Sequence, residues 1–147
     1  MASAIALARS DAEIAACYPV MAQLRPHIAA EDFVPRVRRQ MSQGYELAVL
    51  SADGRPAAVA GFRVLEYLFS GVTLYVDDLV TDSAHRSKGY GEDLLSWLTE
   101  HGIGRGCLSL QLDSGVQRYD AHRFYLTQRM RISSHHFALD LPPKPGS

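Results

Sequence analysis

Cysteine and long apolar runs are scarce in this sequence. Only two cysteines, Cys17 and Cys107, occur among the 147 residues, far apart and without a Cys-x-x-Cys spacing. We therefore expect buried free thiols rather than a disulfide or a catalytic thiol, and a cytoplasmic location. No apolar segment approaches the length of a membrane-spanning helix, so we expect no membrane partner.

The sequence also lacks an excess of positive or of negative charge. The 15 Lys and Arg residues nearly balance the 16 Asp and Glu residues, and the net charge is −1. Because a nucleic-acid-binding face needs clustered positive charge, we expect no nucleic-acid partner. We also expect no metal site, since the rings of His135 and His136, neighbours in a strand-like run, would point to opposite faces.

The sequence does contain enough apolar material for one core. At 147 residues, 47% of them hydrophobic, the chain has the size of one domain that needs no disulfide or metal to fold. We expect a single domain over residues 1–141. The tail over residues 142–147, Pro-Pro-Lys-Pro-Gly-Ser, is expected to be disordered, as terminal segments without packing partners often are.

Hydrophobic periodicity predicts a mixed order of helices and strands. The expected strands cover residues 5–8, 45–50, 57–65 (or as far as 68), 74–81, 107–112 and 132–141. The expected helices cover residues 31–42, 89–101 and 118–128, with one more between Asp11 and Pro26. Asp53-Gly54 predicts a tight hairpin turn. This order indicates an α/β (α+β) fold, a mixed and mostly antiparallel sheet flanked by helices.

The most informative segment is Arg86-Ser87-Lys88-Gly89-Tyr90-Gly91, between an expected strand and an expected helix. A loop that leads directly into a helix leaves backbone N–H groups without partners and presents the positive end of the helix dipole. Gly89 and Gly91 let that backbone approach a ligand closely, and Arg86 and Lys88 add positive charge. These features predict a phosphate or pyrophosphate site.

The spacing of this loop separates three kinds of phosphate site. A Walker-type loop has a longer spacing that ends in Gly-Lys-Ser/Thr, which is absent here. The dinucleotide fingerprint needs a third glycine, where this chain has Leu94. The pattern that remains, Arg/Gln-x-x-Gly-x-Gly/Ala, is matched from Arg86 to Gly91. It resembles the acyl-CoA loop of the GNAT superfamily of N-acetyltransferases.

Two flanking segments extend this resemblance over roughly residues 45–140. Asp77-Asp78-Leu79-Val80-Thr81-Asp82 resembles the acidic and apolar strand that leads to the loop in that family. Ala121-His122-Arg123-Phe124-Tyr125 is similar to its Ala-x-x-Phe/Leu-Tyr helix. The resemblance implies that strands 74–81 and 107–112 splay apart around the pantetheine arm of the cofactor, and family habit makes a homodimer an expectation.

The resemblance also implies acetyl-CoA as the cofactor and assigns roles to residues. The backbone N–H groups of residues 86–91, helped by the Arg86 or Lys88 side chain, would hold its pyrophosphate. An N–H near Leu79, Val80 or Thr81 would stabilise the tetrahedral oxyanion. Tyr125 would protonate the departing thiolate, a transfer that is uphill by only about 2 kcal/mol between the ordinary pKa values of a phenol and a thiol.

The base that takes the proton of the attacking amine is one of three acids. Alternation along a strand would put Asp77 and Asp78 on opposite faces, so only one of them would face the cleft. Two adjacent acids are unusual in a strand, which favours a functional reading. Glu66, on the preceding strand, could take the role instead.

The chain departs from the family pattern at two places. Arg118 stands where the family often has an Asn that contacts the pantetheine region, so we include it among the cofactor-binding residues. Arg129-Met130 replaces a Gly-Phe pair after the last helix. Since glycine there would take a left-handed conformation, we expect a different helix end.

The function that follows is acetyl-CoA-dependent N-acetylation of a primary amine by direct attack. The acceptor is a small-molecule or peptide amine, and the acids of the central strand suggest a cationic one. One alternative is a protein acetyltransferase that accepts an N-terminus or a lysine. Another is a non-catalytic acyl-CoA-binding sensor of the same fold. A third, nucleotide binding by a different phosphate-loop fold, predicts a preference for ATP or NAD over CoA.

Overall fold

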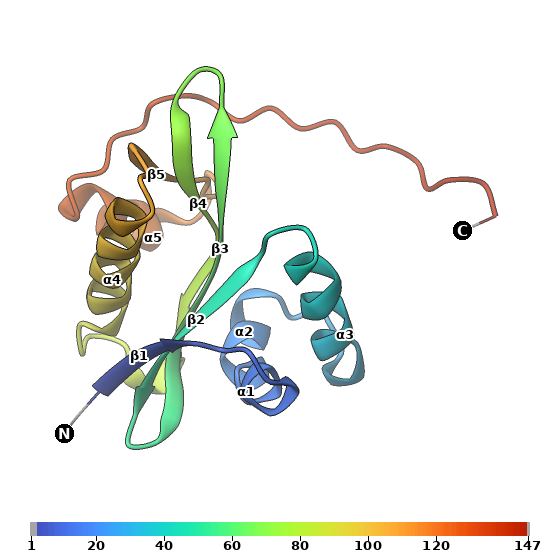
Figure 1. The fold of residues 1–147 in the computed structure, drawn as a ribbon, viewed down its shortest axis with the longest axis vertical. Coiled ribbons are helices and arrows are strands. Elements are labelled where there is room, and N and C mark those ends of the chain that lie inside the picture. The colour runs from blue at the N-terminus through green and yellow to red at the C-terminus, as the bar shows by residue number, and fades with distance from the viewer. Residues whose placement is uncertain (1–2, 147) are drawn as a thin grey trace. The chain divides into compact units, whose positions relative to one another are not determined.

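The computed structural model describes residues 3–146 and contains one five-stranded sheet (Figure 1). The strands are β1 (Ser3–Leu7), β2 (Glu46–Ala52), β3 (Arg55–Tyr67), β4 (Gly71–Thr81) and β5 (Ser109–Leu112), in that spatial order. The first four pair antiparallel and β5 pairs parallel to β4. The expected mixed, mostly antiparallel sheet is confirmed. Its first tight turn is also the expected one, with Asp53 and Gly54 at φ 55° and 77° between the paired Ala52 and Arg55.

The helices are α1 (Asp11–Ala16), α2 (Tyr18–Leu24), α3 (Ala30–Met41), α4 (Tyr90–Gly104) and α5 (Tyr119–Thr127). The single helix expected between Asp11 and Pro26 is therefore two, divided at Cys17. Pro19 lies in the first turn of α2, where its missing N–H costs nothing. Within one continuous helix it would remove a backbone hydrogen bond, as Pro35 does inside α3. Within residues 3–146, no helix combines the length and apolar character that crossing a bilayer requires.

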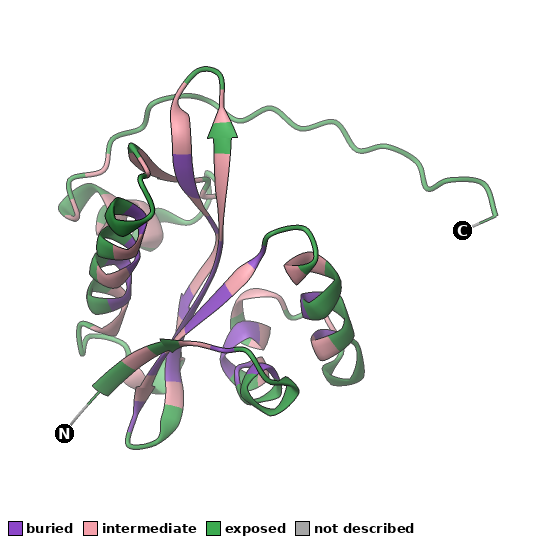
Figure 2. Ribbon diagram, viewed as in Figure 1, coloured by how far each residue is buried: buried purple, intermediate pink, exposed green. Residues whose placement is uncertain are grey.

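Two apolar clusters lie on opposite faces of the sheet. Helices α1–α3 cover one face and α4 covers the other, with buried strand residues between them (Figures 1 and 2). The first cluster joins Ile14, Cys17, Val20, Met21, Phe33 and Val37 to Leu47, Val59 and Val80. The second joins Leu94 and Leu98 to Ala58, Ala60, Phe62, Leu74 and Val76. Both cysteines are free, and burial raises the pKa of Cys17 to about 12.

The chain divides into two compact units, Met1–Leu112 and Asp113–Ser147. The second unit contains α5 followed by a segment without regular structure, so the strand expected over 132–141 is not formed. Its large apolar side chains are exposed: Ile132, Phe137, Leu139 and Leu141. A strand exists only where a neighbour pairs its backbone, and alternation in the sequence does not supply that neighbour. Ser147, the end of the expected disordered tail, lies outside the described residues.

The end of α5 also differs from expectation. Arg129 takes the left-handed conformation itself, at φ 66°. The Arg129 N–H donates to the Leu126 carbonyl and the Met130 N–H donates to the Tyr125 carbonyl, both at 3.1 Å. This is the Schellman arrangement that a glycine would normally close. The expected change of helix end was wrong, because the two hydrogen bonds hold an arginine in the conformation that glycine prefers.

Candidate active site

The predicted phosphate loop lies between β4 and α4. A short 3-10 turn (Ser83–His85) leads into it, and α4 begins at Tyr90. Ser87 and Gly89 are both left-handed, at φ 71° and 81°, and no side chain caps the helix at Gly89. The first N–H groups of α4 therefore have no side-chain partner, and Arg86 and Lys88 are exposed beside them. This geometry suits the diphosphate of a nucleotide cofactor.

The start of the loop is fixed by a glutamine of α2. The Gln23 side-chain amide donates to Asp82 Oδ1 at 2.9 Å, and its oxygen accepts from the Ser83 N–H at 2.9 Å. Asp82 Oδ1 also accepts from the Ala84 N–H at 3.3 Å. The bond from Gln23 is the main cause that lowers the pKa of Asp82. Sequence reasoning missed Gln23, because nothing in its own helix marks it as a partner of a distant loop.

The β4 strand loses its parallel neighbour before it reaches the loop. Pairing between β4 and β5 runs from Thr73–Ser109 to Val76–Leu112 and stops there. In the described part of the sheet, residues 78–81 have a strand neighbour only on the β3 side. The backbone of Leu79, Val80 and Thr81 thus lies on a strand edge, at the place where the splay was expected.

A β-bulge lies at the same place in β4. Gly61 pairs with Asp78 and Phe62 pairs with Val76, so Asp77 is an extra residue with no partner in β3. Such an insertion shifts the alternation of side chains by one position. Val76 accordingly packs in the cluster beneath α4, whereas Val80 packs in the cluster beneath α1–α3.

The bulge corrects one expectation about the acids. Asp77 and Asp78 do not lie on opposite faces, because the extra residue turns both toward the α2 and α3 side of the sheet. Both line a pocket of about 420 Å³ formed by α2, α3, β3 and β4. Its polar lining consists of Arg25, His27, Arg36, Gln40, Tyr45, Arg63, Tyr75, Asp77 and Asp78.

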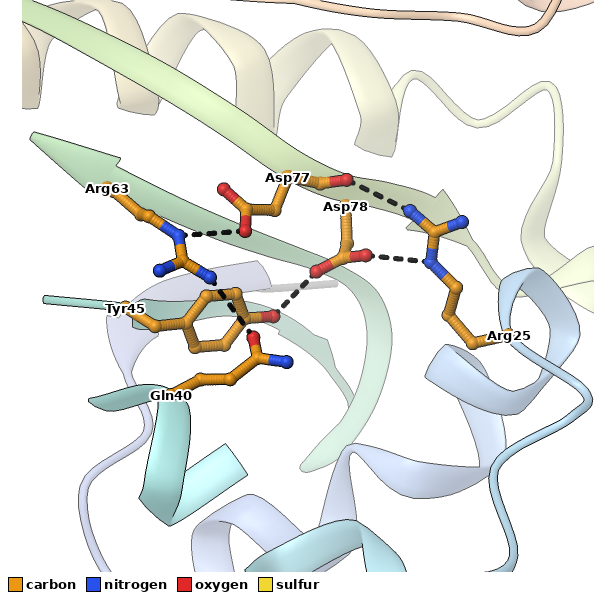
Figure 3. A network of polar contacts seen from close by, with 6 residues as sticks. All are labelled: Arg25, Gln40, Tyr45, Arg63, Asp77 and Asp78. Carbon is orange, nitrogen blue, oxygen red and sulfur yellow. Dashed lines mark hydrogen bonds and ion pairs between the residues drawn. The ribbon is translucent and has the colours of Figure 1, made fainter. Parts of the chain in front are cut away.

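A polar network holds the two acids in this pocket (Figure 3). Asp78 uses both carboxylate oxygens: Oδ1 accepts from Arg25 Nε and Oδ2 accepts from the Tyr45 hydroxyl, each at 2.8 Å. Asp77 Oδ2 accepts from Arg63 Nε at 2.9 Å. Arg25 Nη2 also donates to the Asp77 backbone carbonyl at 3.0 Å. The charge that suggested a cationic acceptor is therefore neutralised by two arginines.

One atom of this network has no partner among the described residues. Asp77 Oδ1 is buried and accepts no hydrogen bond. Burial raises the pKa of Asp77 above its ordinary value, and the Arg63 hydrogen bond opposes that shift. Burial and the neighbouring Asp78 carboxylate raise the pKa of Tyr45 well above its usual range, so this phenol stays protonated as a donor. A buried carboxylate oxygen without a partner, on a residue that lines a pocket, is a candidate proton acceptor.

The remaining predicted residues lie elsewhere. Glu66, near the far end of β3, is exposed and does not line the pocket. Tyr125 and Arg118 belong to the second unit, where Arg118 occupies the N-cap position of α5 and Tyr125 is half-buried. Burial raises the pKa of the Tyr125 phenol, and the positive charge of Arg118 partly opposes this.

A mixed sheet whose acid-bearing strand leads through the predicted phosphate loop into a helix is the arrangement that the resemblance to acetyltransferases implied. The chain belongs to the GNAT acetyltransferase family, and the profile of the "Acetyltransferase (GNAT) family" matches residues 12–129. This family consists of N-acetyltransferases that use acetyl-CoA as the acetyl donor.

Known proteins of this kind resemble the chain in sequence and in fold. "Uncharacterized N-acetyltransferase YhdJ" of Bacillus subtilis is 35% identical over 117 residues, 79% of this chain and 82% of that protein. "Glucosamine 6-phosphate N-acetyltransferase 1" of Oryza sativa subsp. japonica is 37% identical over 89 residues, 56% of this chain and 53% of that protein. The chain thus matches about half the length of the rice relative.

A solved structure agrees on the fold. AAC(6')-Iy in complex with the bisubstrate analogue CoA-S-monomethyl-acetylneamine has a TM-score of 0.84 and 11% identity, covering 97% of this chain and 100% of that one. Because the identity is low, the likeness establishes the GNAT fold and not the acceptor.

Proposed function

We propose that this enzyme moves the acetyl group of acetyl-CoA to a primary amine bound in the pocket, by direct attack of that amine. The observation that carries the proposal is that Asp77 lines the pocket and its buried Oδ1 has no hydrogen-bond partner among residues 3–146. It lies on the strand whose next residues have a free edge and lead to the phosphate loop. The proposed base and the strand edge thus follow one another along β4, and the proposed anion site comes after the end of that strand.

The loop over residues 86–91 and the free edge of β4 would bind the donor, acetyl-CoA. The backbone N–H groups of residues 86–91 would bind the diphosphate, with Arg86 and Lys88 adding charge-assisted bonds. Arg118 would contact the pantetheine region. Bound acetyl-CoA supplies the acetyl group as a thioester, a reactive acyl donor. The family profile spans both compact units, which supports one acetyltransferase domain over residues 1–141.

The chemistry needs two proton transfers and one set of oxyanion donors. Asp77 would take the proton from the acceptor ammonium, directly or through one water, so that the neutral amine can form the new C–N bond. Backbone N–H groups near Leu79, Val80 or Thr81 would stabilise the oxyanion. The C–S bond then breaks, and Tyr125 would give its proton to the thiolate. Asp78 would position the site, because both of its oxygens are already engaged.

Cofactor preference is tested first, by thermal shift with CoA, ATP and NAD. A ligand that binds only the native state raises the unfolding midpoint, so CoA should raise it and the other two should not. Stabilisation by ATP or NAD in place of CoA would contradict the proposal and favour a different phosphate-loop function.

Turnover is tested by following thiol release from acetyl-CoA with a panel of amines that includes lysine peptides. We expect release that depends on the amine and falls in Tyr125→Phe. Turnover of peptides alone would favour a protein acetyltransferase. Tight CoA binding without release for any amine would favour a non-catalytic sensor.

A further inference from the structure

The charges of the pocket do not balance. Its wall holds the side chains of Arg25, Arg36 and Arg63, together with His27, against two carboxylates. Arg25 is paired with Asp78 at 2.8 Å and Arg63 with Asp77 at 2.9 Å. These two pairs cancel, so one guanidinium remains in excess even when His27 is neutral.

The excess charge belongs to Arg36 of α3. Arg36 is exposed and makes no hydrogen bond or ion pair with any residue between 3 and 146. Its neighbour Arg38, on the same helix, is by contrast bound to Asp11 at 2.7 Å and donates to the Arg9 carbonyl at 2.8 Å. Phe33, Val37 and Gln40, which flank Arg36 at helical spacing, also line the pocket. The position is therefore on the pocket side of α3.

We propose that the acceptor amine also carries an acidic group, a carboxylate or a phosphate, which Arg36 binds at the pocket mouth with help from His27. Guanidinium forks match both groups through two parallel hydrogen bonds. An anion at Arg36 completes the charge balance and holds the amine end toward Asp77. The pocket volume of about 420 Å³ fits a small molecule. This inference rests on the proposed acetyl transfer.

The test compares acceptors that differ only in the acid. One pair is 6-aminohexanoate and 6-aminohexanamide, and the other is 3-aminopropyl phosphate and 3-aminopropanol. In each pair the acid is far enough from the amine to leave the pKa of the amine little changed. A difference in rate between the two members therefore reports recognition of the acid's charge. The carboxylate pair and the phosphate pair together show which acid is preferred. We expect kcat/KM to be at least about tenfold higher for the acidic member of one pair or both.

Two arginine variants on one helix supply the control. Arg36→Gln should reduce the preference to less than about threefold, through a higher KM for the acid with little change in kcat, as expected when a uniform binding contact is lost. Arg39→Gln removes an exposed arginine of α3 that does not line the pocket, and should leave the preference intact. Equal rates within both pairs, or equal effects of the two variants, would overturn the proposal.

A binding measurement separates this inference from the proposed function. Calorimetry with 6-aminohexanoate and 3-aminopropyl phosphate on the CoA-loaded protein should show binding that Arg36→Gln weakens about tenfold. Acid binding at Arg36 without turnover of any amine would contradict the acetyl transfer and leave the anion site standing. Turnover at equal rates with and without the acid, together with equal binding by wild type and Arg36→Gln, would contradict the anion site and leave the acetyl transfer standing.

Discussion

The hydroxyl of Tyr45 occupies the space in which a side chain at Gly61 would begin. A Cβ built on Gly61 would lie 1.8 Å from the Tyr45 oxygen and 2.3 Å from the ring carbon that bears it. Tyr45 reaches across β3 at this point to donate its hydrogen bond to Asp78. The missing side chain of Gly61 is thus what lets the phenol reach the acid on the next strand.

Gly61→Ala should therefore displace Tyr45 and break its bond to Asp78. We expect a loss of about 1–3 kcal/mol in the free energy of unfolding, as for other overpacked buried sites, together with slower acetyl transfer. Urea denaturation measures the first effect and thiol release the second. The control is Gly104→Ala at the end of α4, where a Cβ meets nothing within 4 Å. A Gly61→Ala protein as stable as that control would refute the steric reading.

Asp77→Asn should remove the proton acceptor while keeping an oxygen for Arg63. We expect kcat/KM to fall by about 10²–10⁴, the usual contribution of a general base. Because the pKa of Asp77 is raised, the acidic limb of the wild-type pH–rate profile should turn above the ordinary aspartate pKa of about 4. Asp78→Asn is the comparison, and it should act mainly through stability, since Asp78 is fully hydrogen-bonded. An unchanged acidic limb in Asp77→Asn would exclude Asp77 as the base.

The same acid makes a prediction for stability. A carboxyl group whose pKa is raised by folding stabilises the fold when protonated, below its unfolded pKa of about 4. That contribution is lost as the pH rises through the folded-state pKa. The unfolding free energy of wild type relative to Asp77→Asn should therefore decrease from acidic to neutral pH. Parallel urea titrations across this range measure it, and a difference that grows with pH would have the wrong sign.

Gly89→Ala tests the phosphate loop. Gly89 has φ 81° and open space around it, so alanine fits sterically but strains the backbone by about 1 kcal/mol. Gly106 has φ 79° and equally open space at the end of the α4 region, so Gly106→Ala carries the same strain away from the loop. Both variants should lose similar stability, and only Gly89→Ala should weaken CoA binding, by about tenfold in Kd. Equal CoA affinity in the two variants would argue against a diphosphate at this turn.

Arg129→Gly should stabilise the end of α5. The left-handed conformation that Arg129 adopts costs an L-residue about 1–2 kcal/mol, of which glycine recovers part after its own entropy cost. We expect the unfolding free energy to rise by about 0.5–1 kcal/mol. Arg123→Gly, in the interior of the same helix, should lower it by about 1 kcal/mol. Thermal melts in which both variants raise, or both lower, the unfolding midpoint would contradict the Schellman ending of α5.

The sequence predicts a phosphate loop at residues 86–91 because the signals for it are local. Gly89, the two basic residues and the helix that follows all lie within one short segment, and the left-handed Gly89 agrees with that pattern. The hairpin at Asp53-Gly54 is found for the same reason. Pro19 favours the division of the expected helix at Cys17, because proline removes a helix hydrogen bond. Pro35, however, lies inside the continuous helix α3, so a proline alone does not set a helix boundary.

The pocket depends on pairings that no local pattern carries. The bulge at Asp77 is set by register with β3, so simple alternation placed the two acids wrongly. Tyr45, Arg25 and Arg63 come from three different elements and meet the acids only in the folded sheet (Figure 3). Residues 132–141 alternate as a strand would, but in the part of the chain that the structure describes no neighbouring strand pairs with them, so the expected strand does not form.

The inserted residue in β4 also bears on how this enzyme can change over evolutionary time. Removing the residue at position 77 would restore regular pairing, because Phe62 already pairs with Val76 and Gly61 with Asp78. Asp78, Leu79 and Val80 would keep their present faces, and only the Asp77 carboxylate would be lost. One deletion in this strand would therefore remove the candidate base and leave both apolar clusters intact.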